Sequence, residues 1–295
     1  MNLQSLFSTV IVEQTYLDPG YSGHASDVWR VQTTQEEVVV RALRLGEELA
    51  GPFWKGCYSL FGIDPKQIFD LEPINAALAH LCPIPIPQVL RKGLMDGRSY
   101  VVVEYMPGSP LNNFTSLPER TLEELGQALA RIHTRPFSYY GHPTGRVRYA
   151  LATFHTRLIE TMRMLVNQFY QHDATIKEAL PSICKMVSQL PPFEKGALIL
   201  VDIDPTQFLT DGRHITALVD TEAYAIGPRE LDFIGLEYIL DQQGATALAR
   251  GYSTILPLPD LSRVRPVYRY LYRLLEVQGS TELEAWMAQP LLFEG

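Results

Sequence analysis

The chain has 295 residues, enough for one large domain or two closely packed lobes, and its hydrophobic fraction of 46% can fill a sizeable core. A formal net charge of −8 argues against a nucleic-acid-binding protein, which normally carries a basic face. The three cysteines form no CxxC pair, no apolar run reaches membrane-spanning length, and the N-terminus lacks the basic region of a signal peptide. We therefore expect a cytoplasmic protein that binds neither nucleic acid nor a membrane.

The first third of the sequence predicts an antiparallel β-meander with one helix. Stretches rich in alternating and β-branched residues indicate five strands, at 8–17, 27–32, 37–43, 89–91 and 99–105. Helical spacing covers 72–81 and ends at the proline-rich segment 82–89, where ring constraints disfavour helix. Residues 45–70 follow no regular pattern, yet they contain five aromatic side chains, too many for a solvated linker.

After Pro107 and Gly108 the sequence becomes mainly helical. Helical spacing is found at 121–133, 147–170 and 175–189, and two short apolar strands follow at 197–201 and 215–219. The rest is mostly helix, and the segment 268–273 is typical of a packed amphipathic helix with solvated arginines. We predict an α+β fold in two lobes, a β-rich lobe over 1–106 and a mainly helical lobe over 107–295.

The two short strands of the second lobe each end in an aspartate, Asp202 and Asp220. A turn at 210–213 precedes the second strand, and a hairpin of the two strands would bring both carboxylates to one end. Two carboxylates that converge at strand ends can hold a metal ion and accept a proton. The sequence therefore predicts a reaction centre at this edge.

This block resembles the catalytic loop and metal-binding aspartate of the aminoglycoside phosphotransferases and related kinase-like small-molecule kinases. The family pattern is roughly HGDxxxxN, then a strand, then Asp, and residues 200–207 read LVDIDPTQ before the strand that ends at Asp220. The resemblance implies a bilobal, protein-kinase-like fold with ATP and Mg²⁺ as cofactors. It implies that Asp202 accepts or orients the substrate hydroxyl and that Gln207 and Asp220 hold Mg²⁺. Asp232 resembles a later structural aspartate.

The rest of the chain matches the family in order. The resemblance implies a phosphate-covering loop with Ser22 and Gly23, a strand-three cation at Arg41, a helix glutamate that pairs with this cation at Glu72, and an adenine-binding hinge at Glu104 and Met106. It leaves little room for residues 45–70, which we expect to be an insertion that covers the nucleotide cleft from the small lobe.

Three positions depart from the family pattern: Arg41 replaces lysine, Gln207 replaces asparagine and Leu200 replaces histidine. Arginine keeps the charge but is planar and bulkier, and glutamine keeps the amide oxygen but adds a methylene. The main hypothesis is an ATP-dependent phosphotransferase that acts on a hydroxyl of a small polar molecule. The departures leave an alternative, a non-catalytic kinase-like module that binds nucleotide or a partner without turnover.

A second enzyme class shares part of the pattern. The segment ALILVDIDPT also fits the haloacid-dehalogenase motif, in which Asp202 would be a phosphoryl-accepting nucleophile and Asp204 a general acid. That family carries the motif near the start of a doubly wound domain, whereas here it lies in the last third of the chain. No lysine follows it to balance the charge of a phosphate.

Overall fold

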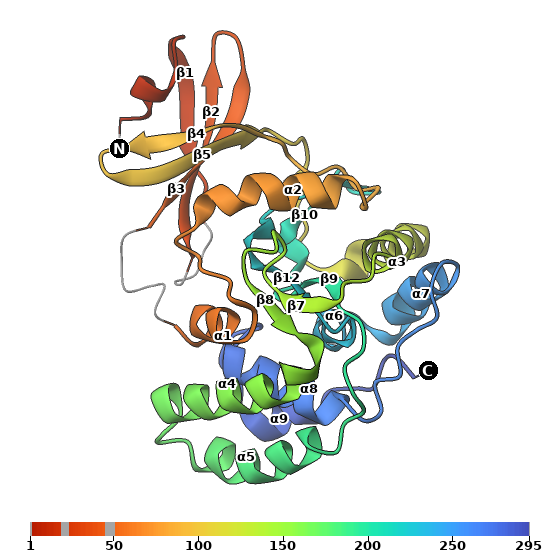
Figure 1. Ribbon diagram of the computed structural model, residues 1–295. Helices are drawn as coiled ribbons and strands as arrows, with labels where there is room; N and C mark the ends of the chain where they lie inside the picture. Colours follow the sequence, from red (N-terminus) through yellow and green to blue (C-terminus); the bar gives the residue numbers. More distant parts are fainter. Residues whose placement is uncertain (1, 19–23, 45–50, 295) are drawn as a thin grey trace.

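A computed structural model describes residues 2–18, 24–44 and 51–294. A small antiparallel sheet lies on one side of a larger, mainly helical body, and helix α2 (Leu71–Ala79) lies between them (Figure 1). This arrangement is the α+β, two-lobed fold that the sequence predicts. The predicted loop residues Ser22 and Gly23 lie outside the described residues.

The small sheet has the strand order β1-β2-β3-β5-β4, in which every neighbouring pair is antiparallel. Its strands are β1 (Ile11–Tyr16), β2 (Ser26–Thr33), β3 (Glu37–Leu43), β4 (Val89–Met95) and β5 (Arg98–Glu104). Because successive side chains of a strand point to opposite faces, β3 serves two clusters. Val40 packs with Leu3 and Phe7 of the N-terminal segment, and Val39 packs with Leu71 at the start of α2.

Two further sheets belong to the helical body. One has the order β11-β10-β6 and the other the order β8-β7-β12-β9. Their strands are β6 (Ser109–Pro110), β7 (Tyr139–Gly141), β8 (Arg148–Ala150), β9 (Ala197–Leu200), β10 (Phe208–Thr210), β11 (Ile215–Leu218) and β12 (Tyr224–Gly227).

The strand pairing near the two aspartates differs from the predicted hairpin. Strand β11 pairs with β10, whereas β9 pairs with β12 in the other sheet. Strand β10 was not predicted because it has only three residues, too few for a pattern to be recognised in the sequence. The prediction that β9 and β11 form one hairpin is therefore wrong, although both still deliver their aspartates to the same region.

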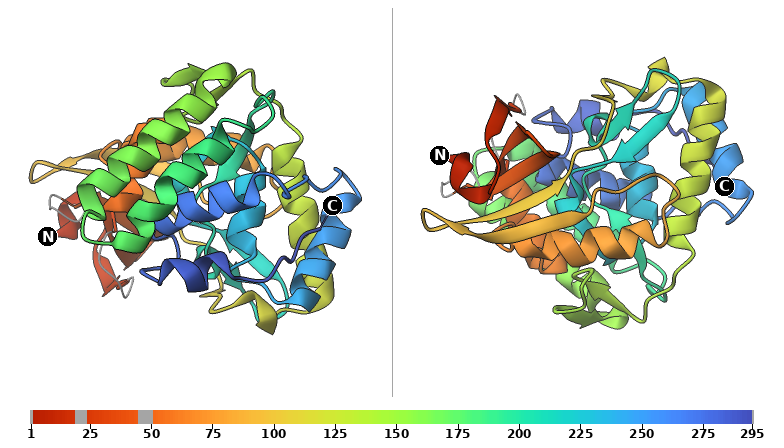
Figure 2. Two further views of the ribbon diagram at one scale, coloured as in Figure 1. Left: turned by 90° about the horizontal axis from the view of Figure 1, so that it is seen from below. Right: turned by 90° about the horizontal axis from the view of Figure 1, so that it is seen from above.

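Helices pack closely in the body. They are α3 (Glu119–His133), α4 (Phe154–Phe169), α5 (Ala174–Val187), α6 (Glu230–Leu236), α7 (Gln242–Ser253), α8 (Arg265–Leu275) and α9 (Leu283–Met287). Helix α3 lies along α7, and α4 lies beside α5 (Figures 1 and 2). Residues 147–170, predicted as one helix, are divided between β8 and α4. None of the helices in the described part of the chain has the length and hydropathy needed to cross a membrane.

The segment after β3 contains a helix, α1 (Pro52–Phe61), that packs on the helical body. Its Trp54, Cys57 and Phe61 are buried in the main core, and Gly56 lies directly against Leu275 of α8. The prediction that this segment covers the nucleotide cleft from the small lobe is wrong for the described part, because its apolar side chains are buried against α4 and α8. Residues 45–50 lie outside the described residues.

Candidate active site

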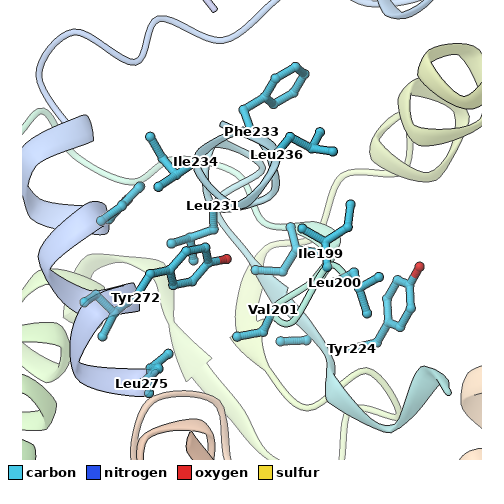
Figure 3. Packing of buried hydrophobic residues seen from close by; sticks show 14 of the residues in the cluster. Ile199, Leu200, Val201, Tyr224, Leu231, Phe233, Ile234, Leu236, Tyr272 and Leu275 are labelled. Atoms are coloured by element: carbon cyan, nitrogen blue, oxygen red, sulfur yellow. The ribbon is translucent and has the colours of Figure 1, made fainter. Parts of the chain in front are cut away.

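Asp202 follows the buried strand β9 and belongs to the first loop of the site. Its side chain has no ion pair among the described residues. Burial, together with the negative charges of Asp204 and Asp220, raises the pKa of Asp202 to about 8. The preceding residue, Val201, belongs to the apolar core that Figure 3 shows, together with Tyr272 of α8. Asp202 is thus a desolvated carboxyl group that is close to other acids.

The loop after Asp202 is held by a capping box. Asp204 accepts a hydrogen bond from the amide of Thr206 at 2.8 Å, and Gln207 Oε1 accepts from the amide of Asp204 at 3.2 Å. Gln207 Nε2 donates to the carbonyl oxygen of Asp202 at 2.6 Å. Gln207 therefore fixes the loop backbone from inside, with 5% of its surface exposed. Its amide oxygen keeps a second lone pair, so its role as a metal ligand stays a prediction.

Asp220 follows β11 and adopts a left-handed backbone conformation, with φ 59° and ψ 52°. This conformation is unfavourable for a residue other than glycine, and it is often found where a side chain is held for function. Two backbone hydrogen bonds flank it: Val219 N donates to Gln207 O at 2.8 Å, and Val201 N donates to Ala223 O at 3.3 Å. Both bonds join the Asp220 segment to the loop that carries Asp202.

Arg41 connects the small sheet to the Asp220 segment. Its Nη2 atom lies 2.6 Å from Asp220 Oδ1 and 2.6 Å from Glu222 Oε2. Burial alone would raise the pKa of Asp220, but the Arg41 guanidinium holds it well below its ordinary value. Burial raises the pKa of Glu222 above its ordinary value, against the attraction of Arg41. Asp220, the more exposed of the two carboxylates, remains accessible, with 37% of its side chain exposed.

The predicted pair of Arg41 with Glu72 is not formed. Glu72 is bonded to Lys92 of β4 on an exposed surface, and Glu222 takes the place predicted for it beside Arg41. Glu72 lies in the first turn of α2, where the helix dipole favours an acid regardless of function. Glu222 was not predicted from the sequence as the partner of Arg41, although its position two residues after Asp220 was a signal for this pairing.

A buried network supports the strand that leads to Asp202. Asp232 accepts a hydrogen bond from the amide of Leu200 at 3.0 Å and is bonded to His133 Nε2 at 3.0 Å. His133 Nδ1 is bonded in turn to the Tyr252 hydroxyl at 3.0 Å. Leu200 lines a small apolar cavity with Leu129 and Phe208. The histidine of the family pattern would lie among these apolar groups if it stood at position 200. A leucine suits this environment better.

The predicted hinge lies where β5 ends. The amide of Glu104 donates to Gln88 O at 3.0 Å, and its carboxylate accepts from the amide of Gln88 at 2.9 Å. Met106 follows before β6, between the small sheet and the body. The contacts of Glu104 and Met106 with adenine stay predictions.

The donors of the site fit Mg²⁺ held by a nucleotide. Among the described residues, no three His, Cys, Asp or Glu side chains form a cluster that could hold a metal by itself. Mg²⁺ is usually bound by one or two carboxylates, with substrate phosphates and water as the other ligands. Asp220 meets this requirement, and Glu222 is a second carboxylate beside it.

Comparison with protein families assigns the chain. Residues 19–267 match the model of a family described as the phosphotransferase enzyme family. The chain belongs to this family. Membership identifies ATP-dependent phosphoryl transfer to a small-molecule hydroxyl as its class of reaction. A search of curated protein sequences found no match.

Solved structures of other phosphotransferases share the fold. A putative fructosamine-3-kinase from Haemophilus somnus 129PT is 15% identical, with TM-score 0.63 and coverage of 96% of this chain and 91% of that chain. The macrolide 2′-phosphotransferase MphH from Brachybacterium faecium is 12% identical, with TM-score 0.62 and coverage of 94% and 89%. A thermostable mutant of the aminoglycoside phosphotransferase APH(4)-Ia, bound to AMP-PNP and hygromycin B, is 18% identical, with TM-score 0.63 and coverage of 94% and 89%. These likenesses support the kinase-like fold of the phosphotransferase.

Proposed function

We propose that the protein transfers the terminal phosphoryl group of ATP to a hydroxyl of a small polar molecule, and that it does so in the cytoplasm. The observation that carries the proposal is the pairing of two differently tuned carboxyl groups in one site. Asp202 is free of ion pairs among the described residues and has a pKa of about 8, whereas Asp220 is kept ionised beside Arg41. One suits a proton acceptor, and the other suits a cation ligand.

Each residue has a separate part in the proposed reaction. Asp220 would hold the metal, with Glu222 and Gln207 as further oxygen donors, and Arg41 would neutralise the phosphates. Bound Mg²⁺ supplies positive charge that screens the phosphates during transfer. Asp202 binds the acceptor hydroxyl, orients its oxygen and receives its proton. Phosphoryl transfer needs little covalent chemistry from a protein, so the fixed loop around Asp202 contributes mainly by positioning.

One observation favours the non-catalytic alternative. Arg41 bridges Asp220 and Glu222 directly, and in that position it neutralises the carboxylates on which a metal would bind. A protein that kept this bridge with nucleotide bound would bind ATP without dependence on Mg²⁺ and without turnover.

A screen of small hydroxyl compounds with Mg-ATP, read as ADP release, tests the proposal. Asp202→Asn is the matched variant, because it keeps the shape of the side chain and removes the proton acceptor. We expect an acceptor-dependent rate that falls at least about a hundredfold in Asp202→Asn, with ATP affinity by calorimetry within about threefold. If ATP affinity collapses in the folded variant, Asp202 is a metal ligand and the role proposed for it is wrong.

A further inference from the structure

Asn75 is a buried polar residue of α2 that the proposed reaction does not use. It is 3% exposed, and its Nδ2 donates to the carbonyl oxygen of Pro87 at 2.8 Å. Its Oδ1 accepts a hydrogen bond from the hydroxyl of Thr221, which is 1% exposed. Both polar atoms of the Asn75 amide are therefore committed to defined partners inside the protein.

Thr221 is the residue between the two carboxylates that meet Arg41. It begins the short 3₁₀ turn Thr221–Ala223, directly after the left-handed Asp220. A shift of Thr221 must move Asp220 on one side and Glu222 on the other, because all three lie on one tight turn. The Thr221 hydroxyl therefore fixes the position of both carboxylates.

The partner of Thr221 belongs to α2, which also packs against the small sheet. Helix α2 starts on the inner face of the small sheet, where Leu71 packs with Val101 and Val103. The same proline-rich segment that accepts from Asn75 also holds β11, since Leu218 N donates to Pro85 O at 2.9 Å. Asn75 thus closes a ring of hydrogen bonds around the segment that ends in Asp220.

The pair that would otherwise couple α2 to the strand-three cation is missing, because Glu72 is bonded to Lys92. We propose that the Asn75–Thr221 hydrogen bond is the contact through which α2 holds Asp220 and Glu222 in place for metal-dependent nucleotide binding. Asn75 and Thr221 are then positioning residues that touch neither substrate nor metal. The inference rests on the proposed function, in which Asp220 holds the metal of the nucleotide.

Thr221→Val is the decisive variant, because it removes the hydroxyl, keeps the volume and leaves Asn75 Oδ1 buried without its donor. We expect the affinity for ATP in the presence of Mg²⁺ to fall about tenfold, as for the loss of one buried hydrogen bond. The affinity for ATP in EDTA should change less than about twofold. Thr221→Ser restores the hydroxyl and should return the affinity in Mg²⁺ to that of the wild type.

Thr161→Val is the matched control. Thr161 is also a fully buried threonine, and its hydroxyl is bonded to Ser59 at 2.8 Å, between α1 and α4. This variant should lower the melting temperature by a similar amount but leave both ATP affinities unchanged. An equal loss of affinity with and without Mg²⁺ in Thr221→Val, or the same loss in Thr161→Val, would overturn the inference.

Amide hydrogen exchange of the ligand-free protein separates this inference from the proposed function. Residues 218–223 should exchange faster in Thr221→Val than in the wild type, and Thr221→Ser should restore their protection. A wild-type protein whose ATP affinity ignores Mg²⁺ contradicts the proposed function. Even in that case, the exchange data still test the role of Thr221. Exchange at residues 218–223 that is the same in Thr221→Val as in the wild type contradicts the positioning role, and faster exchange in the variant supports it.

Discussion

Arg41 illustrates how one side chain can depend on partners that are far away in the sequence. Its side chain is only 12% exposed, so leaving the guanidinium group without a partner would carry a large desolvation penalty. Two carboxylates from the Asp220 segment supply that partner, and both accept from the same guanidinium atom, Nη2. The substitution of arginine for the family lysine is thus accompanied by a nearby second acid, Glu222.

The raised pKa of Asp202 makes the stability of the ligand-free protein depend on pH. In the unfolded chain this carboxyl ionises near pH 4, whereas in the folded protein it ionises near pH 8. Between these values the folded state holds a proton that the unfolded state has lost, so the free energy of unfolding decreases as the pH rises. This contribution is fully present below about pH 4 and is lost as the pH passes about 8.

Asp202→Asn removes this titration and should therefore make the free energy of unfolding depend less on pH. We expect the variant to be more stable than the wild type by on the order of 1 kcal/mol at pH 8, with the difference shrinking toward pH 5. Urea unfolding at several pH values measures it. Asp96→Asn, in the exposed turn between β4 and β5, controls for the loss of one negative charge. A difference that stays constant with pH would show that Asp202 is not a buried acid.

The proximity of candidate site residues could be predicted where one short segment contains the whole pattern. Asp202, Asp220 and Gln207 come from residues 200–220, and the structure brings them together as one loop system. The partner of Arg41 was predicted wrongly, because an ion pair depends on the direction in which α2 presents its acids. Asn75 and Thr221 were not predicted, because a buried asparagine and a threonine carry no pattern of their own.

At the scale of elements, α3 and α7 show how glycine allows helices to approach closely. Gly126 of α3 lies against the backbone of Leu248, and Gly251 of α7 lies against the carbonyl group of Glu123. A side chain at either position would meet backbone atoms, which cannot rotate away. The backbones of the two helices are therefore in direct contact. Helix α3 ends at His133, which belongs to the buried network with Asp232 and Tyr252.

Gly251→Ala should destabilise the protein, although alanine normally favours a helix over glycine. The added methyl group would collide with the Glu123 carbonyl, and we expect a loss of about 1–3 kcal/mol in the free energy of unfolding. Thermal or urea unfolding measures the loss. Ser253→Ala, on the exposed side of the same helix, should change stability by less than about 0.5 kcal/mol. A Gly251→Ala variant as stable as the wild type would contradict the close contact.

Helix α8 shows what the amphipathic pattern does not reveal. The arginines of residues 268–273 were expected to be solvated, but Arg269 is 2% and Arg273 is 4% exposed. Arg269 binds Glu237 at 2.7 Å and donates to the carbonyl groups of Met287, Gln289 and Pro290. The expectation was wrong because Glu237 follows α6 and the three carbonyl groups belong to the C-terminal segment, whose path over α8 has no local pattern in the sequence.

At the scale of the whole molecule, most of the longer strands and helices were predicted, but α1 and the arrangement of the short segments were not. Strand β3 occupies 37–43 as predicted, because its alternation is determined by its own two faces. Helix α1 was missed because Gly51 and Pro52, which begin it, also suit a loop, and its apolar residues are explained only by α4 and α8. The local sequence pattern determines whether a segment forms a strand or a helix, but the elements against which it packs depend on the complete fold.

The predicted lobe boundary at residue 106 does not match the packing of α1. The main core includes Trp54 of α1 together with Trp286 of α9, whereas Trp29 packs against the small cluster on the outer face of the sheet. We therefore propose that α1 is part of the helical lobe, although it precedes residue 106. Clusters with few buried residues open more easily than a large continuous core.

The three tryptophans of the chain provide one reporter for each region. In three variants that keep a single tryptophan and replace the other two by phenylalanine, fluorescence during urea unfolding follows Trp29, Trp54 or Trp286. We expect Trp54 and Trp286 to share a midpoint, because α1 packs into the same core as α8 and α9, and Trp29 to change at a lower urea concentration, by about 0.5 M or more. The far-UV signal of each variant controls for the effect of the replacements. If the urea midpoint of Trp54 equals that of Trp29 and lies below that of Trp286, then α1 unfolds with the small lobe and the proposal is wrong. If all three midpoints coincide, the small sheet is no less stable than the helical body.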